Sequence, residues 1–365
     1  MLGIRELTFT AMIGFLIVII LGPIFIPMLA RFKFGQTVRD EGPQSHLAKN
    51  GTPTMGGVMM IVAILITGLT RAKISQGLIV GLICIVGFGF VGFLDDFIKI
   101  KMKRSLGLKA YQKIILQFAL ALYIAYYQYS ASPSATQLVI PFTNHIINLG
   151  IWYIPFMMIF IIGTVNAVNL TDGLDGLASG VTLIVSCFFI LFAVSISNSD
   201  VAILAAATAG ACLGFLGFNA YPAKVFMGDT GSLTLGYILS FLAVQYTMNT
   251  YEAGINYEGA ILISFSVLLV PCLDVVRVVL GRVRRGKDPF MPDKTHIHHK
   301  FLAMGFTPRK AMISILCISF LFCASNVFLV SYLNNTVLFL CDVAVWALMN
   351  LYISKLISRR NISQI

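Results

Sequence analysis

The chain has 365 residues, of which 58% are hydrophobic and only 11% are charged, and its net charge is +11. Soluble domains carry about 25% charged residues, so the composition excludes an ordinary soluble domain. The excess of cations would suit nucleic-acid binding, but the one-sided distribution described below accounts for it without nucleic acid. We therefore predict an integral membrane protein made of helices, which satisfy their own backbone hydrogen bonds in lipid.

Eleven apolar runs approach or exceed the length that crosses a bilayer as a helix. They lie at approximately 8–30, 55–70, 77–94, 114–130, 151–168, 179–197, 201–218, 232–248, 259–280, 311–333 and 336–356. Several are short, which favours tilting or burial within protein. The sequence thus predicts an all-α polytopic membrane protein of ten or eleven transmembrane helices, forming a single domain over 1–365.

The cations set the orientation. If the N-terminus lies outside, all Lys and Arg residues fall on the inner side except Arg5, Arg71 and Lys73. Cytoplasmic loops are enriched in these residues, so this topology is preferred. It places the polar loops described next in the cytoplasm and attracts anionic lipids or substrates to them.

The first inner loop contains RDEGPQSHLAKNGTPTMGG, residues 39–57. Its prolines break any helix and its glycines permit tight turns. Such a loop can bring backbone amides, Lys49 and Thr54 close to an anion, although a glycine-rich start to the next helix is equally natural.

The second inner loop follows the apolar run in VGFLDDFIKIKMKR, residues 91–104. Asp95 and Asp96 would lie at a helix C-terminus, where the helix dipole disfavours carboxylates. They also lie near the edge of the hydrocarbon, where ionisable groups are costly and usually functional. Lys99 is within helical reach of both. The pattern indicates a metal or general-base site at the membrane surface; the alternative is a solvated helix end with incidental ion pairs.

Two features carry no predicted chemistry. The outer loop ASPSATQLVIPFTNHIINLG, residues 131–150, alternates apolar and polar residues and is a candidate for a small β-hairpin. The seven cysteines lie within apolar runs, show no paired metal spacing and are interpreted as small apolar fillers.

The third inner loop lies within NAVNLTDGLDGLASG, residues 166–180. Asn166, Asn169, Asp172 and Asp175 recur every third residue, which gives one polar stripe if the stretch is helical. No cation in the segment neutralises the two aspartates. Unpaired carboxylates at a membrane surface favour a metal, a proton or a ligand rich in hydrogen-bond donors.

The fourth inner loop lies within FNAYPAKVFMGDTGSL, residues 218–233. Asp229 stands between glycines just before a new apolar run, with Phe226 and Asn219 upstream. An aromatic ring, an amide and backbone groups can together hold a planar base. A turn followed by a helix cap is the plainer interpretation.

The fifth inner loop, RRGKDPFMPDKTHIHHKF, spans residues 284–301 and contains His296, His298 and His299. Zinc is the rival ligand, but no cysteine is nearby and the H-E-x-x-H spacing is absent. Lys294 and Lys300 flank the histidines and would repel a metal cation. We therefore favour a phosphate-binding cluster.

Taken together, the inner loops offer carboxylates, excess cations and a possible base-stacking site. This combination suits a polyanionic nucleotide with Mg²⁺, which prefers a few carboxylates, water and substrate phosphates. The membrane setting suggests a lipid as the second substrate.

The motifs resemble a known superfamily. The DD-x-x-K of Asp95, Asp96 and Lys99, together with NAVNLTDGLDGLA and PAKVFMGDTGSL, is similar to the polyprenyl-phosphate N-acetylhexosamine-1-phosphate transferases. RDEGPQSHLAKNGTPTMGG resembles one branch, the phospho-N-acetylmuramoyl-pentapeptide transferases of peptidoglycan synthesis. The resemblance covers about residues 20–305 and implies transfer of phospho-MurNAc-pentapeptide from its UDP donor to undecaprenyl phosphate, giving lipid I and UMP.

The same resemblance implies roles for individual residues. Asp95 is the candidate base or the group that orients the lipid phosphate, and Asp96 shares that role. Asp229 is the first candidate Mg²⁺ ligand, with Asp95, Asp96 and Asp172 as further candidates. Phosphoryl oxygens would be stabilised by Lys99, Lys113 and His298, and uracil would stack on Phe226. The other candidates for substrate binding are Lys49, Thr54, Asn166, Asn169, Leu170, Asp172, Asp175, Asn219, Gly228, His296 and His299.

The resemblance also sets expectations for the setting of the protein. It implies a multi-pass protein of the bacterial inner membrane with its active site facing the cytoplasm. It is compatible with a homodimer, and it implies inhibition by uridine-nucleoside antibiotics.

Two features depart from the muramoyl branch. Its three adjacent histidines appear here as HIHH, and its usual ten spans become eleven, so the run 336–356 is a candidate addition to the family core. Both departures are similar to the sister branch that transfers N-acetylglucosamine 1-phosphate to the same lipid. We weigh the long N-terminal stretch above them and keep the sister activity as the alternative.

Two other functional classes remain. A transporter of anionic nucleotides or lipids would place ionisable groups near mid-membrane. Asp274 and Asp342 are the candidates, and neither has an evident cationic partner within its own run, since Arg277 lies nearer the inner end. A non-catalytic scaffold would not need carboxylates in three separate loops.

Overall fold

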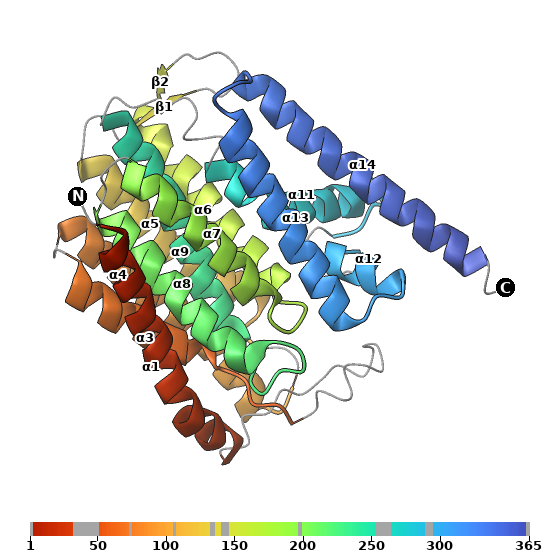
Figure 1. The fold of residues 1–365 in the computed structure, drawn as a ribbon, viewed down its shortest axis with the longest axis horizontal. Helices are drawn as coiled ribbons and strands as arrows, with labels where there is room; N and C mark the ends of the chain where they lie inside the picture. The colour runs from red at the N-terminus through yellow and green to blue at the C-terminus, as the bar shows by residue number, and fades with distance from the viewer. Residues whose placement is uncertain are drawn as a thin grey trace.

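The computed structural model describes residues 3–31, 51–72, 75–104, 107–131, 136–139, 146–195, 199–252, 264–288 and 295–362. These residues form a bundle of long helices with a short helix at one end (Figure 1). The long helices are α1 (Ile4–Arg31), α3 (Gly57–Arg71), α4 (Gln76–Lys101), α5 (Ala110–Ala131), α6 (Tyr153–Thr171), α7 (Leu177–Ser195), α8 (Ser199–Asn219), α9 (Gly228–Glu252), α11 (Leu269–Arg284), α13 (Pro308–Leu329) and α14 (Asn335–Ile362). The short helices are α12 (Ile297–Ala303) and the 3₁₀ helix η1 (Gly150–Trp152).

Each of the eleven predicted spans overlaps one of these long helices. Eight of the described helices are long and apolar enough to cross a membrane by themselves. Helix α3 has only 15 residues, as expected for a short run packed among other helices. The prediction of an all-α polytopic membrane protein is confirmed.

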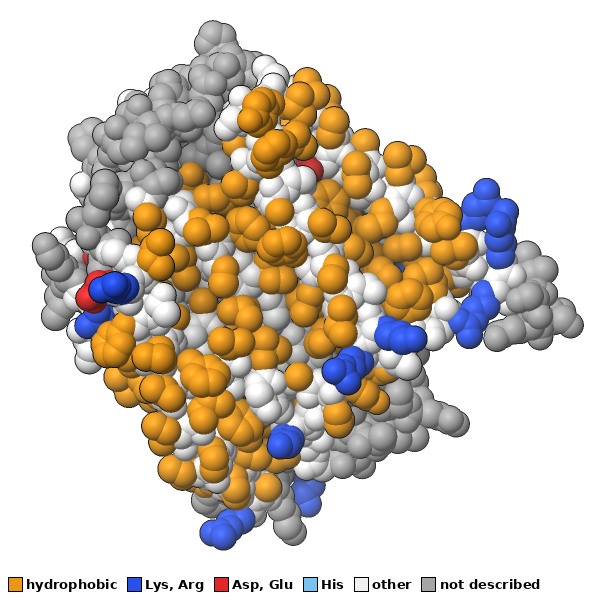
Figure 2. Space-filling view, in the orientation of Figure 1, with side chains coloured by type: hydrophobic (Ala, Val, Ile, Leu, Met, Phe, Trp, Pro, Cys, Tyr) orange, Lys and Arg blue, Asp and Glu red, His pale blue; other side chains and the backbone are white. Residues whose placement is uncertain are grey.

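The surface agrees with a lipid environment. Large apolar side chains such as Ile159, Phe328 and Leu351 are exposed along the helices. Figure 2 shows an extensive hydrophobic face, with Lys and Arg side chains gathered along its lower right edge. Such a face would be a liability in water but is the normal exterior of a membrane bundle.

The candidate β-hairpin in the outer loop is present. Strand β1 (Gln137–Val139) pairs antiparallel with β2 (Ile146–Asn148), with Leu138 opposite Ile147. Figure 1 shows the hairpin at one end of the bundle, whereas α12 lies toward the other.

Helices α4 and α9 approach closely at the end of the bundle away from the hairpin. A Cβ atom added to Gly92 of α4 would stand 2.2 Å from the carbonyl oxygen of Asp229. Small residues at helix contacts let backbones come together in this way. The absence of a side chain at Gly92 therefore brings the last turns of α4 against the first turn of α9.

Candidate active site

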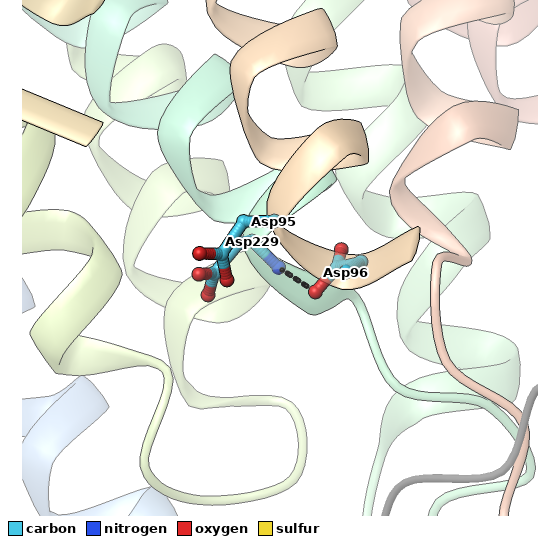
Figure 3. Close-up of side chains that lie close together, drawn as sticks. All are labelled: Asp95, Asp96 and Asp229. Atoms are coloured by element: carbon cyan, nitrogen blue, oxygen red, sulfur yellow. Dashed lines mark hydrogen bonds between the residues drawn. The ribbon is translucent and has the colours of Figure 1, made fainter. Parts of the chain in front are cut away.

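Three carboxylates meet where α4 ends and α9 begins. Asp95 and Asp96 lie in the last turns of α4, and Asp229 lies in the first turn of α9. One oxygen from each of the three lies within 4.8 Å of the other two (Figure 3). The structure thus joins two motifs that are more than a hundred residues apart in the sequence.

Asp96 holds the N-terminus of α9. It is 3% exposed, and it accepts hydrogen bonds from the backbone N–H groups of Asp229 (3.1 Å) and Thr230 (2.9 Å) and from the Thr230 hydroxyl (2.8 Å). Figure 3 draws the bond from the Asp229 nitrogen. A helix N-terminus favours a carboxylate because its first N–H groups lack partners and its dipole is positive there. The charge that is unfavourable at the end of α4 is therefore stabilised by α9.

Gly228 makes this arrangement possible. Its φ is 73°, a left-handed conformation that favours glycine, and an added Cβ would lie 2.4 Å from Asp96 Oδ2. The residue that the sequence suggested as a binding position thus also shapes the turn before α9.

Asp229 is surrounded by cations and an amide. Its Oδ2 lies 2.7 Å from Lys113 Nζ and 3.0 Å from Lys99 Nζ, and its Oδ1 accepts a hydrogen bond from Asn169 Nδ2 (3.0 Å). Burial opposes ionisation of Asp229, which precedes the predicted span 232–248, but Lys113 and Lys99 hold its pKa well below the usual range. Asp229 is therefore a carboxylate at neutral pH, as a metal ligand must be.

Asp95 accepts a backbone hydrogen bond with one oxygen and forms an ion pair with Lys99 through the other. It is 3% exposed, and its Oδ1 accepts the backbone N–H of Leu108 (2.9 Å). Its Oδ2 lies 2.5 Å from Lys99 Nζ, but it is buried and receives no hydrogen bond of good geometry. This oxygen is able to accept a further ligand or a proton.

The carboxylates fit a divalent cation. Mg²⁺ binds oxygens at about 2.0–2.1 Å, so ligands on opposite sides of the ion are about 4 Å apart, close to the size of this cluster. Asp96 uses both oxygens to bind the first turn of α9, mostly its backbone, whereas the partners of Asp229 are side chains that a cation can displace, which makes Asp95 and Asp229 the better ligands. Lys99 and Lys113 compete with a cation for Asp229 and are equally suited to bind phosphate.

Of the two predicted asparagines on helix α6, Asn169 contacts the carboxylate cluster and Asn166 contacts helix α5. Asn169 donates to Asp229 and also to Ser232 Oγ (2.7 Å). Asn166 donates to Gln117 Oε1 (2.7 Å) on α5, so its amide helps join two helices. The helix ends at Thr171, so the predicted polar stripe is helical only over its first half. Leu170, near the end of α6, is 40% exposed.

The loops after α6 and α8 brace each other. Asn219 Oδ1 accepts the backbone N–H of Gly176 (3.0 Å), and its Nδ2 donates to the Val225 carbonyl (2.9 Å). Asp175 accepts the N–H of Ala223 (3.1 Å). Asp172 caps the end of α6 in the same loop. Asn219 and Asp175 therefore act on loop geometry, which the sequence alone did not reveal.

Phe226 lies in the braced loop beside the start of α3. Its N–H donates to the Pro53 carbonyl (2.8 Å), and its carbonyl accepts the N–H of Gly56 (2.9 Å). Thr54 is buried between these contacts. The structure thus brings the described part of the first inner loop to the site, whereas Lys49 lies outside the described residues.

The histidines approach the site from α12. His298 packs its ring against Gly173, where an added Cβ would lie 2.3 Å from Nε2, and His299 lies 4.2 Å from His298 between ring centroids. His296 Nδ1 lies 2.8 Å from Asp274 Oδ2. The fifth inner loop therefore reaches the third.

From the sequence alone, no cationic partner was evident for Asp274, and the structure shows that Arg277 is that partner. Arg277 pairs with Asp274 (2.6 Å), and Asp274 also accepts the backbone N–H of Ile297 at the start of α12. The carboxylate considered as a transporter group instead anchors the histidine loop. The spacing of three residues between Asp274 and Arg277 on one helix was the signal.

Comparisons with known proteins place the chain. Residues 78–247 match the model of glycosyl transferase family 4. A phospho-N-acetylmuramoyl-pentapeptide-transferase of Clostridioides difficile (strain 630) is 77% identical over 237 residues, which cover 65% of this chain and 74% of that protein. Proteins with the same name from Clostridium botulinum (strain Alaska E43 / Type E3) and Alkaliphilus metalliredigens (strain QYMF) are 42% and 43% identical over 86% and 88% of this chain and 93% and 98% of their own lengths.

The chain belongs to the phospho-N-acetylmuramoyl-pentapeptide-transferase family. The similarity to the muramoyl branch is therefore confirmed, and the sister branch is not favoured. The HIHH spacing and the eleventh helix occur in this family member, so neither marks the sister branch.

Proposed function

We propose that this protein transfers phospho-MurNAc-pentapeptide from UDP-MurNAc-pentapeptide to undecaprenyl phosphate, with lipid I and UMP as products. Membership of the transferase family carries this conclusion. The site supports it, because Asp95, Asp229, Lys99 and Lys113 meet at the end of an apolar helix. A membrane-bound phosphate and a soluble nucleotide can meet only at such a surface.

The orientation we propose places this site in the cytoplasm, at the inner membrane of a bacterium. The distribution of Lys and Arg supports it, since the loops around the site carry almost all of them. A UDP donor made in the cytoplasm would then reach the site directly.

We propose Mg²⁺ as the cofactor, with Asp229 and Asp95 as its protein ligands and Asp96 fixing the turn that presents Asp229. When bound, the ion supplies positive charge that neutralises the diphosphate of the donor. Lys99 and Lys113 would contact phosphoryl oxygens, for which their ammonium groups are suited. Asp95 would orient the lipid phosphate or hold its proton.

The donor nucleotide is assigned to the braced loop before α9. Phe226 would stack on uracil, with Asn169, Thr54 and the turn at Gly228 nearby. His298 would contact phosphoryl oxygens from the opposite loop. Uridine-nucleoside antibiotics would then compete for the same loop.

The test offers purified enzyme UDP-MurNAc-pentapeptide or UDP-GlcNAc, each radiolabelled in the sugar, with undecaprenyl phosphate and Mg²⁺. We expect label in the lipid fraction from the muramoyl donor, with release of UMP. Each tenfold preference corresponds to about 1.4 kcal/mol of differential transition-state binding. Label transferred from UDP-GlcNAc alone would instead assign the sister activity, and no lipid label from either donor would refute a transferase.

A further inference from the structure

The C-terminal helix α14 presents one continuous buried stripe. Asp342, Trp346 and Asn350, each four residues from the next, are all about 4–5% exposed. Leu338 and Ile353 extend the stripe at either end. This face of α14 therefore packs along most of the helix.

The stripe contacts two different elements. Near its start, Asp342 accepts a hydrogen bond from Asn326 of α13 (3.0 Å), and Trp346 packs against Phe322 (6.3 Å between ring centroids). Figure 1 shows α14 then diverging from α13 and passing α12. The second half of the stripe is thus used for α12.

Polar contacts join α14 to α12. Lys300 Nζ donates to Asn350 Oδ1 (3.0 Å) and Ser354 Oγ (3.1 Å), and Arg360 donates to the carbonyl of Met304, just after α12. Burial and the charge of Arg277 lower the pKa of Lys300 to about 8. The oxygens of α14 compensate part of that cost by accepting hydrogen bonds from the ammonium group.

Helix α12 needs such support. It has seven residues, far fewer than a helix requires to be stable by itself. Asp274 holds its first turn on one side, through His296 and the N–H of Ile297. Asn350 and Ser354 hold the opposite part through Lys300.

The position of α12 matters because it carries His298. The His298 ring lies against Gly173, in the loop between Asp172 and Asp175. We propose that α14 is a positioning element for the donor side of the site, in which Asn350 and Ser354 hold Lys300 and thereby keep His298 against that loop. The statement about donor binding rests on the proposed transferase function; the statement about docking does not.

The test compares Asn350→Leu/Ser354→Ala with Leu351→Ala in purified full-length enzyme. The double variant removes both side-chain acceptors of Lys300, whereas Leu351 is on the same turn and 68% exposed. We expect faster hydrogen exchange in residues 296–304 of the double variant alone. We also expect its KM for UDP-MurNAc-pentapeptide to rise about tenfold, with its KM for undecaprenyl phosphate within about twofold of the parent.

Unchanged exchange in residues 296–304, or equal changes in both KM values, would overturn the proposal. Ser354→Ala alone serves if the double variant elutes as aggregate in size-exclusion chromatography, with a smaller change expected in the same direction. If the parent enzyme transfers neither donor, the proposed function fails, while the exchange comparison still decides whether α14 holds α12.

Discussion

Three neighbouring carboxylates have three different environments. Asp96 is saturated by hydrogen bonds from α9, Asp229 faces two ammonium groups, and Asp95 retains a buried oxygen without a well-aligned donor. From the sequence alone, the adjacent residues Asp95 and Asp96 could not be distinguished and were assigned a shared role. Only the packing of α4 on α9 separates a group suited to chemistry from one that supports the backbone.

Asp229→Asn is expected to abolish turnover. The amide removes the negative charge that Mg²⁺ would bind and that now pairs with Lys99 and Lys113. Transfer of labelled donor across a Mg²⁺ titration measures the effect, with retention of a monodisperse elution peak as the control for folding. Near-normal turnover at ordinary Mg²⁺ concentration would remove Asp229 from the metal site.

Asp95→Asn and Asp96→Asn should separate catalysis from stability. Asp96→Asn places either an NH₂ group or a neutral oxygen against the three donors that now face Asp96. The free energy of unfolding in detergent should therefore fall by about 1–3 kcal/mol. Asp95→Asn can still accept from Leu108, so stability should hold while kcat falls by about 10²–10⁴. Thermal denaturation and single-turnover transfer are measured on the same preparations. Equal losses of stability in the two variants would contradict the distinction.

Phe226→Ala should weaken nucleotide binding. Stacking on an aromatic ring contributes about 1–3 kcal/mol per base in nucleic-acid complexes, so affinity for a uridine ligand should drop about tenfold or more. Calorimetric titration with UMP measures it. Exposed Tyr221→Ala, in the same loop, is the matched control. Equal affinities for parent and Phe226→Ala enzyme would place the base elsewhere.

At the scale of elements, apolar runs predicted the helices well because bilayer-length helices need little else to specify them. Their contacts were less accessible. Asn219 and Asp175 were predicted as ligand-binding residues, which stays a prediction, and the structure shows that they also brace the loops after α6 and α8 by hydrogen bonds to backbone groups. Any residue offers the same backbone N–H and C=O groups, so the sequence does not reveal which polar side chains bind the backbone of another loop. A structural amide and a ligand-binding amide therefore cannot be distinguished before the fold is known.

Gly92→Val should disrupt the junction of α4 and α9. A branched side chain would collide with the Asp229 carbonyl, which already lies 2.2 Å from the position of an added Cβ. Separating the helices moves Asp229 from Asp95, so we expect activity to fall at least about tenfold with a lowered unfolding temperature. Gly163→Val is the control, because an added Cβ there meets nothing within 4 Å. Activity equal to that of the control would show that close packing of the two helices is dispensable.

At the scale of the whole molecule, the orientation of the chain in the membrane is predicted from the distribution of Lys and Arg and from the number of apolar runs. The site residues on α4, α6, α9 and α12 were predicted to share one side, and the structure brings those elements together. Lys300 was interpreted as a charge that repels a metal, and the structure adds a contact with α14 that the sequence did not indicate. The role of the extra helix was not recognisable in the sequence because its second half packs on α12, a short loop helix, after its first half has contacted α13.

Sided labelling tests the complete topology. If all eleven long helices cross the membrane as the sequence predicts, α1 and α14 end on opposite sides, and the Arg360 contact with Met304 places the end of α14 on the side of the site. Cysteine introduced by Arg359→Cys should therefore react with a membrane-impermeant maleimide on the same side as Lys109→Cys, beside the site. Gly3→Cys and Ile147→Cys should react on the opposite side.

In right-side-out vesicles made from a cysteine-free parent, only Gly3→Cys and Ile147→Cys should label before permeabilisation. Labelling of Arg359→Cys in intact vesicles would mean that α14 does not cross the membrane, which would also remove the basis for its contact with α12.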